Sequence, residues 1–265
     1  MRSWLSALSP RRRLLVGAVA LLVAVPLGAF VAARLGQSAR DVPAQDRPGP
    51  VVLVPGYGGN TSSLAALAER VRATGRTAVV VELPDGGTGD LARQADVVET
   101  AVAAALKGAD RGQGVDVVGY SAGGVVVRLW VARHDGVHKA RRIVTLGSPH
   151  HGASIAAAGA VAAPGACPTA CQQLAAGSRL LADLDEPVPN PPSWLSVWTV
   201  QDETVTPPES ARLDGAVNVA VQDLCRQRRV SHSQLPSDDV VTQLVLTALG
   251  PQPLDAPGAV VCVSS

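Results

Sequence analysis

The chain has few aromatic side chains, four cysteines and almost no net charge. Phenylalanine, tyrosine and tryptophan make up 3% of its 265 residues, and the formal net charge at pH 7 is +1. Because neither sign of charge dominates, nucleic acid is not expected as a partner. The cysteines form no Cys-x-x-Cys pair and the histidines show no paired ligand spacing, so no metal site is expected.

The first 36 residues have the composition of an export segment rather than of a folded domain. Arg2 and the arginines at residues 11–13 precede an uncharged apolar run over residues 14–33. A basic start before an apolar run is typical of an export signal, and about 20 apolar residues also suffice to span a bilayer. Small residues at 31–33 offer a cleavage site. We therefore expect residues 1–36 to be a cleaved signal peptide or a retained membrane anchor.

This segment sets expectations for the rest of the chain. Basic residues before the apolar run hold the N-terminus in the cytoplasm and place the remainder outside, either secreted or anchored to the membrane by residues 14–33. Residues 37–49 are polar and Pro-rich, which is typical of a linker. Residues 50–265 are then expected to form one domain, since about 200 residues is an ordinary size for one.

The cysteines all lie in the exported part of the chain. Cys167 and Cys171 are close in sequence, whereas Cys225 and Cys262 lie toward its end. Disulfides form and persist in oxidising compartments. We expect the pairs Cys167–Cys171 and Cys225–Cys262; free thiols and a metal site are the alternatives.

Apolar runs alternate with amphipathic stretches along the predicted domain. Continuously apolar strands that alternate with helices indicate a mostly parallel sheet covered by helices on both faces. Active sites in such sheets lie at the carboxyl ends of the strands. The predicted strands begin near residues 51, 77, 115, 141, 194 and 216, and predicted helices include residues 90–109 and 237–250, the latter with Ser237 as its cap.

Residues 115–134, VDVVGYSAGGVVVRLWVARH, place a Gly-x-Ser-x-Gly motif between an apolar run and a helical pattern. In α/β-hydrolase folds this motif is a sharp turn that exposes its serine, here Ser121, as a nucleophile. The residues two before and two after the serine crowd each other, so both must be small. They are Gly119 and Gly123. The alternative is an ordinary glycine-rich turn whose serine has no chemical role.

A serine hydroxyl needs a general base because it is a weak nucleophile at neutral pH. In this topology the acid of the triad follows the serine along the chain, and the histidine follows the acid. Asp202 comes directly after the predicted strand at 194–200, and we expect it to be the acid, with Glu203 and Asp223 as alternatives. Only His232 lies beyond this strand, so chain order selects it as the base. The other histidines are His134 and His138, expected at the surface, and His150 and His151, expected in a loop.

Acyl transfer also needs N–H donors that stabilise the oxyanion. One donor is expected to be the backbone N–H of Ala122, the residue after the nucleophile. The other should come from the loop after the first strand, where Tyr57 lies in the sequence PGYGG. The alternative is that PGYGG is an ordinary glycine-rich turn.

Five motifs give the chain a resemblance to class 2 bacterial lipases, the small secreted α/β-hydrolases of the Bacillus lipase A kind and their actinobacterial relatives. The motifs are VLVPGYGGN, GYSAGG, TLGSPHHG, QDETVTP and SHSQLPSDD. The resemblance covers roughly residues 50–250 and implies an α/β-hydrolase fold and hydrolysis of acylglycerols or other carboxylic esters without a cofactor. Carried over, Ser121, Asp202 and His232 match the triad, and Tyr57 and Ala122 match the oxyanion donors.

The chain departs from these lipases at two places. It has Pro55-Gly56 where they usually have His-Gly, and Tyr120 where they usually have histidine before the nucleophile. Both changes touch the walls of the site. Residues 153–193 are also additional to the minimal fold, and are expected either to line the acyl pocket or to fill space between two strands.

The sequence thus predicts an extracytoplasmic, monomeric serine esterase or lipase that acts on a lipid or another ester. A cell-envelope acyltransferase or thioesterase on the same fold is the alternative, and a binding protein without activity is the third hypothesis. Contact with a membrane is expected through the N-terminal segment.

Overall fold

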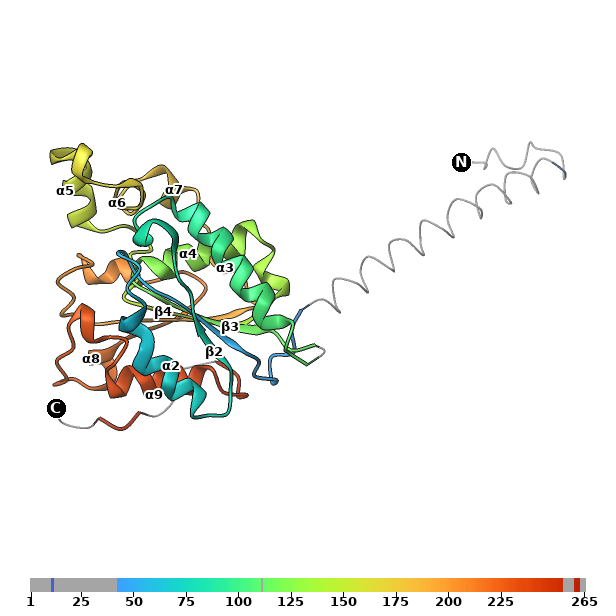
Figure 1. Cartoon of the computed structure of the whole chain (residues 1–265). Coiled ribbons are helices and arrows are strands. Elements are labelled where there is room, and N and C mark those ends of the chain that lie inside the picture. Colours follow the sequence, from blue (N-terminus) through green and yellow to red (C-terminus); the bar gives the residue numbers. More distant parts are fainter. Residues whose placement is uncertain (1–10, 12–41, 111, 255–259, 263–265) are drawn as a thin grey trace, which may run out of the picture. The chain divides into compact units, whose positions relative to one another are not determined.

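The computed structural model describes residues 11, 42–110, 112–254 and 260–262 (Figure 1). The chain divides into two units, Met1–Val42 and Pro43–Ser265, and the second unit is described by itself below. The apolar run at residues 14–33 lies outside the described residues. Among the described residues, no helix combines the length and apolar character needed to cross a bilayer.

Six strands of the described chain form one sheet, in the order β2-β1-β3-β4-β5-β6, and every neighbouring pair is parallel. This confirms the predicted parallel sheet. Since β1 lies between β2 and β3, the connections leave β1 and β3 toward opposite sides, and the carboxyl ends of these two strands border a crevice. The strands are β1 Val51–Val54, β2 Ala78–Val80, β3 Val115–Tyr120, β4 Ala140–Leu146, β5 Ser193–Trp198 and β6 Val217–Ala220.

Helices cover both faces of the sheet. In Figure 1, α3 and α4 lie above the sheet, and α2, α8 and α9 lie below it. Alternate residues of a strand point to opposite faces: Val52 and Val54 pack with α3 and α4, whereas Val51 and Leu53 pack with α2 and α9. The helices are α2 Ala65–Arg72, α3 Leu91–Leu106, α4 Ala122–Arg133, α5 Ser154–Ala162, α6 Thr169–Gln173, α7 Arg179–Ala182, α8 Val221–Leu224 and α9 Asp239–Ala248.

One detail of the sequence prediction changes. The side chain of Asp238 caps α9 by accepting from the N–H groups of Val240 and Val241, so the expected cap, Ser237, was wrong by one residue. The helix begins at Asp239, so the capping position falls on Asp238, and its negative charge also suits the positive end of the helix. Residues 43–49 pack on the domain: the carbonyl of Gln45, for example, accepts from buried Arg141 at 3.0 Å.

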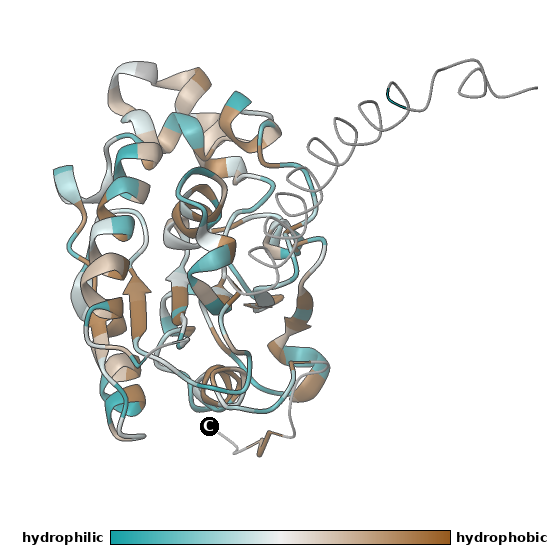
Figure 2. Ribbon diagram, turned by 90° about the vertical axis from the view of Figure 1, so that its right-hand side faces the viewer, coloured by the Kyte–Doolittle hydropathy of each residue, from teal (hydrophilic) through white to brown (hydrophobic). Residues whose placement is uncertain are grey.

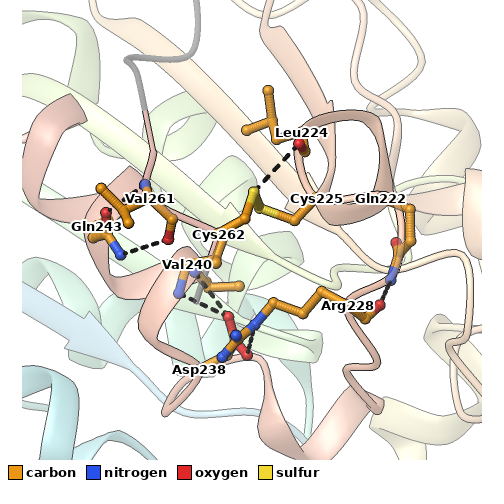
Figure 3. Close-up of a disulfide and its surroundings, with 10 residues drawn as sticks. Gln222, Leu224, Cys225, Arg228, Asp238, Val240, Gln243, Val261 and Cys262 are labelled. Carbon is orange, nitrogen blue, oxygen red and sulfur yellow. Dashed lines mark hydrogen bonds and ion pairs between the residues drawn. A yellow bond between two sulfur atoms is a disulfide. The ribbon is translucent and has the colours of Figure 1, made fainter. Parts of the chain in front are cut away.

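The structure joins Cys167 to Cys171 and Cys225 to Cys262, which are the two expected disulfides. The second bond connects the end of α8 to the C-terminal segment (Figure 3). Gln243 of α9 adds two hydrogen bonds to the backbone of Val261 there, at 3.0 and 3.4 Å. The Cys225–Cys262 disulfide therefore encloses the loop that carries His232. Disulfides are typical of proteins in oxidising compartments.

Replacing Cys225 and Cys262 together by serine should lower the free energy of unfolding by about 3–4 kcal/mol, because the disulfide closes a long loop in the unfolded chain. Urea-induced unfolding followed by circular dichroism measures this change. The matched control is the double replacement of Cys167 and Cys171, which opens a loop of only a few residues and should cost about 2 kcal/mol. Equal losses in the two variants would contradict the expectation.

Candidate active site

Ser121 lies at the turn between β3 and α4, at the carboxyl end of the sheet. Its backbone has φ 53° and ψ −126°, a conformation that residues other than glycine rarely adopt. The N–H of Ser121 donates to the carbonyl of Leu146 in β4 at 2.8 Å. The turn is thus fixed to the neighbouring strand, and the serine lies at its tip.

Close backbone contacts explain why glycine stands on both sides of this serine. A Cβ atom at Gly119 would lie 2.6 Å from the Cα atom of Gly124, and a Cβ at Gly123 would lie 2.3 Å from the carbonyl oxygen of Val54. Contacts this short are sterically forbidden. The motif therefore packs the start of α4 directly against the end of β1.

Ser121, His232 and Asp202 form a continuous chain of polar contacts. The Oγ atom of Ser121 is 2.9 Å from Nε2 of His232, and Nδ1 of the same ring is 2.6 Å from Oδ2 of Asp202. All three side chains are buried. These distances are those of a nucleophile, its base and the carboxylate that orients the base.

Asp202 is itself held in place by the loop that follows it. Its Oδ1 atom accepts from the N–H groups of Thr204 and Val205, at 2.9 and 2.7 Å. One carboxylate oxygen is therefore occupied by the backbone, and the other faces His232. The neighbouring Glu203 is exposed, as is Asp223.

The other histidines have separate partners. His134 and His138 lie within hydrogen-bonding distance of Asp96 and Asp135, at 2.8 and 2.7 Å. His151 lies 4.0 Å from Asp185. His150 is buried, with Nε2 3.1 Å from the hydroxyl of Thr145, and burial is the first cause that holds its pKa well below 6.5. Among the described residues, no cluster of histidine, cysteine and acidic side chains is suited to hold a metal ion.

The loop after β1 lies directly against Ser121. A Cβ atom at Gly56 would come within 2.9 Å of the Cβ of Ser121, so only glycine allows this approach. The next residue, Tyr57, is half-exposed and lines the same cavity as Ser121 and Ala122. The structure thus brings together Tyr57, Ala122 and the serine, as the sequence predicted.

Tyr120 contacts the histidine, a contact that the sequence analysis did not identify. Its hydroxyl donates to the backbone carbonyl of His232 at 3.3 Å, and the two ring centroids are 5.3 Å apart. Burial, followed by the negative charge of Asp202, raises the pKa of Tyr120 to about 12. The phenol therefore keeps its proton over the usual range of assays. The departure from the lipase pattern at this position was the available signal.

An apolar cavity of about 280 Å³ opens beside the serine. The loop after β1, the elbow and residues 204–205 provide part of its wall. Pro149 and the additional segment at residues 153–193 provide the rest, so this segment lines the pocket. Its contribution consists of Ala153, Ile155, Ala156, Cys171 and Leu174.

Comparison with known proteins identifies the family. A family model described as palmitoyl protein thioesterase matches residues 50–182, which is half of the chain. The chain belongs to the palmitoyl protein thioesterase family. The matched region contains Tyr57, Ser121 and Ala122, whereas Asp202 and His232 lie beyond it. No curated protein matches the sequence.

Solved structures show the fold of this family member. Aspergillus fumigatus lipase B aligns with a TM-score of 0.65 and 18% identity over 78% of this chain and 55% of the lipase, so the chain spans about half of that protein. The mature Bacillus licheniformis lipase BlEst2 aligns with a TM-score of 0.63 and 19% identity, over 77% of this chain and 92% of the lipase. These likenesses show the α/β-hydrolase fold of the chain.

Replacing Tyr120 by phenylalanine should slow the labelling of Ser121 by a fluorophosphonate probe about 2- to 12-fold. This range corresponds to the loss of one hydrogen bond that positions His232. The rate constant of labelling, measured against pH, tests this. Because the phenol stays protonated, the pH dependence above neutrality should keep its shape. Tyr120→Ala, which also removes the ring, should be slower still, and an unchanged rate in both variants would exclude a positioning role.

Proposed function

We propose that the protein hydrolyses carboxylic esters of apolar acyl chains through a Ser121–His232–Asp202 triad. The observation that carries this proposal is the chain of contacts from Ser121 through His232 to Asp202, placed at the opening of an apolar cavity. An apolar pocket with a few polar groups at one point is the ordinary form of a site for such a ligand. Acylglycerols, the substrates implied by the resemblance to class 2 bacterial lipases, are the proposed substrate class.

In the proposed reaction Ser121 Oγ attacks the acyl carbonyl while Nε2 of His232 takes the hydroxyl proton. Nε2 then gives this proton to the leaving alcohol, which departs and leaves an acyl-enzyme. Water attacks the acyl-enzyme by the same route and releases the acid. Asp202 fixes the ring orientation and stabilises the imidazolium that forms in each half of the reaction.

The backbone N–H groups of Tyr57 and Ala122 are proposed to stabilise the oxyanion. Gly56 brings the loop after β1 against Ser121, which supports a donor from this loop. Ala122 begins α4, so its N–H belongs to the free N–H groups of a helix start. Donors fixed by the backbone need little reorganisation during the reaction.

A thioester is the second candidate substrate, and the family match favours it. The proposed steps are the same, except that a thiol leaves in place of an alcohol. In either case we propose an enzyme outside the cytoplasm, since the sequence predicts export and the structure contains two disulfides. The N-terminal segment, residues 1–36, is proposed as its signal or anchor.

The full-length protein should be assayed against p-nitrophenyl esters of graded chain length and against palmitoyl-coenzyme A. Release of free acid from the esters supports an esterase or lipase, and a larger kcat/KM for the thioester supports the second candidate. Transfer of the acyl group to an added alcohol without release of acid would identify an acyltransferase. Turnover of none of these substrates, with Ser121 unlabelled by a fluorophosphonate, would reject the proposal.

Ser121→Ala and His232→Ala should each lower kcat by about 10⁴-fold or more, and the double variant should lose little beyond either single one. Asp202→Asn should lose a similar amount or somewhat less. Glu203→Ala is the matched control and should keep its activity, because this neighbouring carboxylate is exposed. Normal activity of Asp202→Ala together with loss in Glu203→Ala would show that the acid is misassigned.

Tyr57→Phe should retain most of the activity, because the proposed donor is the backbone N–H and not the phenol. Tyr57→Pro removes that donor and should lower kcat at least about 10²-fold. Circular dichroism of the proline variant checks that the fold is kept. A collapse of kcat in the phenylalanine variant, with the fold intact, would show instead that the hydroxyl takes part.

A further inference from the structure

Helix α5 exposes an apolar surface at the edge of the cavity. Of its nine residues, Ser154–Ala162, Ala156 is the buried one. Ile155 is 66% exposed and Val161 is 85% exposed. In Figure 1 this helix lies at the upper end of the domain, and the top of the molecule in Figure 2 is pale to brown around it. Exposed apolar surface of this kind commonly marks a site of contact with another molecule.

The surface belongs to a long stretch without charge. Between His151 and Arg179, residues 152–178 contain no lysine, arginine, aspartate or glutamate. The exposed residues that the structure describes after Val161 are also small and uncharged, namely Ala162, Ala163, Gly165 and Ala166. We call the exposed part of residues 155–166 the α5 surface.

Hydrogen bonds and a disulfide attach the two ends of the α5 surface to the domain. Both the N–H and the hydroxyl of Ser154 donate to the carbonyl of Thr206, at 2.9 and 2.8 Å. The N–H of Ala153 donates to Leu174 at 3.0 Å, and the Cys167–Cys171 disulfide closes the turn that follows. Its exposure is therefore a property of the folded domain and not of a loose end.

The composition of the stretch favours lipid over protein as the occupant. Protein interfaces are enriched in aromatic residues, methionine and arginine, and residues 152–178 contain none of these. Most backbone groups of a helix bond to each other, and the hydroxyl of Ser154 is used on Thr206, so the polar groups of the surface that need water are mainly the last carbonyls of the helix. Such a surface can be buried in hydrocarbon at little cost.

The position of Ile155 connects this surface with the reaction. Its side chain is two-thirds exposed and also lines the cavity beside Ser121. An acyl chain that passes from a lipid aggregate into the cavity can thus remain in contact with apolar side chains. We propose that the α5 surface binds the surface of lipid aggregates and places the opening of the cavity against them. The proposal rests on the proposed function for its substrate and on the exposed helix for its site.

Binding of this kind should depend little on salt or on lipid charge, because the α5 surface has no charge to be screened. The probe is therefore a vesicle of phosphatidylcholine, with and without a quencher attached to its acyl chains. Val161→Trp in the full-length protein should show more tryptophan fluorescence than the wild type when vesicles are present. The quencher in the lipid should remove this additional fluorescence, in low and in high salt.

Val261→Trp is the matched control for this measurement. Val261 is 69% exposed and lies in the C-terminal segment beside α9, away from α5. Its added tryptophan should not be quenched. All variants share residues 1–41, so any attachment through that segment is the same in each. Absence of quenching at residue 161, or equal quenching at 161 and 261, would overturn the proposal.

Activity gives a second readout. Val161→Asp should lower kcat/KM about tenfold or more for a long-chain ester presented in phosphatidylcholine vesicles. The variant no longer has a valine side chain to bury in the lipid, and it would have to bury a charge there instead. The same variant should hydrolyse a water-soluble short-chain ester at the wild-type rate, because Val161 does not line the cavity. Val261→Asp should keep both activities, and equal vesicle activity in the two aspartate variants would contradict lipid binding by α5.

The remaining outcomes separate the hypotheses. Size exclusion could show that Val161→Asp changes the oligomeric state, while Val161→Trp is not quenched by vesicles. This result would make α5 a contact between two copies of the chain and would overturn lipid binding. If the wild type cleaves neither ester but residue 161 is quenched, the α5 surface stands and the proposed function fails.

Discussion

The site depends on how closely the backbone of the elbow approaches the end of β1. With glycine at positions 119 and 123, the start of α4 contacts the carbonyl of Val54, and the turn at Ser121 can be sharp. A backbone like that of Ser121 costs about 1–3 kcal/mol. The packing of α4 on the sheet and the hydrogen bond from Ser121 to Leu146 offset this cost. The serine is therefore at a fixed point toward which the later loops converge.

The loops that meet Ser121 come from distant parts of the chain, and each is fixed separately. Asp202 is held by two N–H groups of its own loop, and Tyr120 holds the backbone of His232. Because Tyr120 precedes Ser121, the end of β3 carries both the serine and a side chain that holds the loop of His232. The disulfide at Cys225 and Cys262 closes the segment in which His232 lies.

The apolar lining of the cavity and the polar groups beside it come from different parts of the chain. The polar groups belong to the loops after the strands, whereas α5 and α6 provide much of the apolar lining. Changes in residues 153–193 can therefore alter the shape of the cavity without moving Ser121, Asp202 or His232. The lack of charge over residues 152–178 serves this lining and also leaves an apolar surface outside.

The sequence by itself determined the parallel sheet, the elbow and the chain order of the three residues in the proposed triad. Apolar periodicity, the two glycines and the single histidine after Asp202 are local or ordered along the chain, so they can be recognised without coordinates. It also favoured both cysteine pairs. Only the tertiary structure decided that Tyr120 contacts His232, that Asp238 caps α9, and that residues 153–193 line the cavity. The contact of Tyr120 with His232 joins residues 112 positions apart, and packing between distant elements leaves no periodic signal in the sequence. The cap of α9 is local, but Ser237 and Asp238 are adjacent cap-forming residues, and only the folded backbone decides which of them begins the helix.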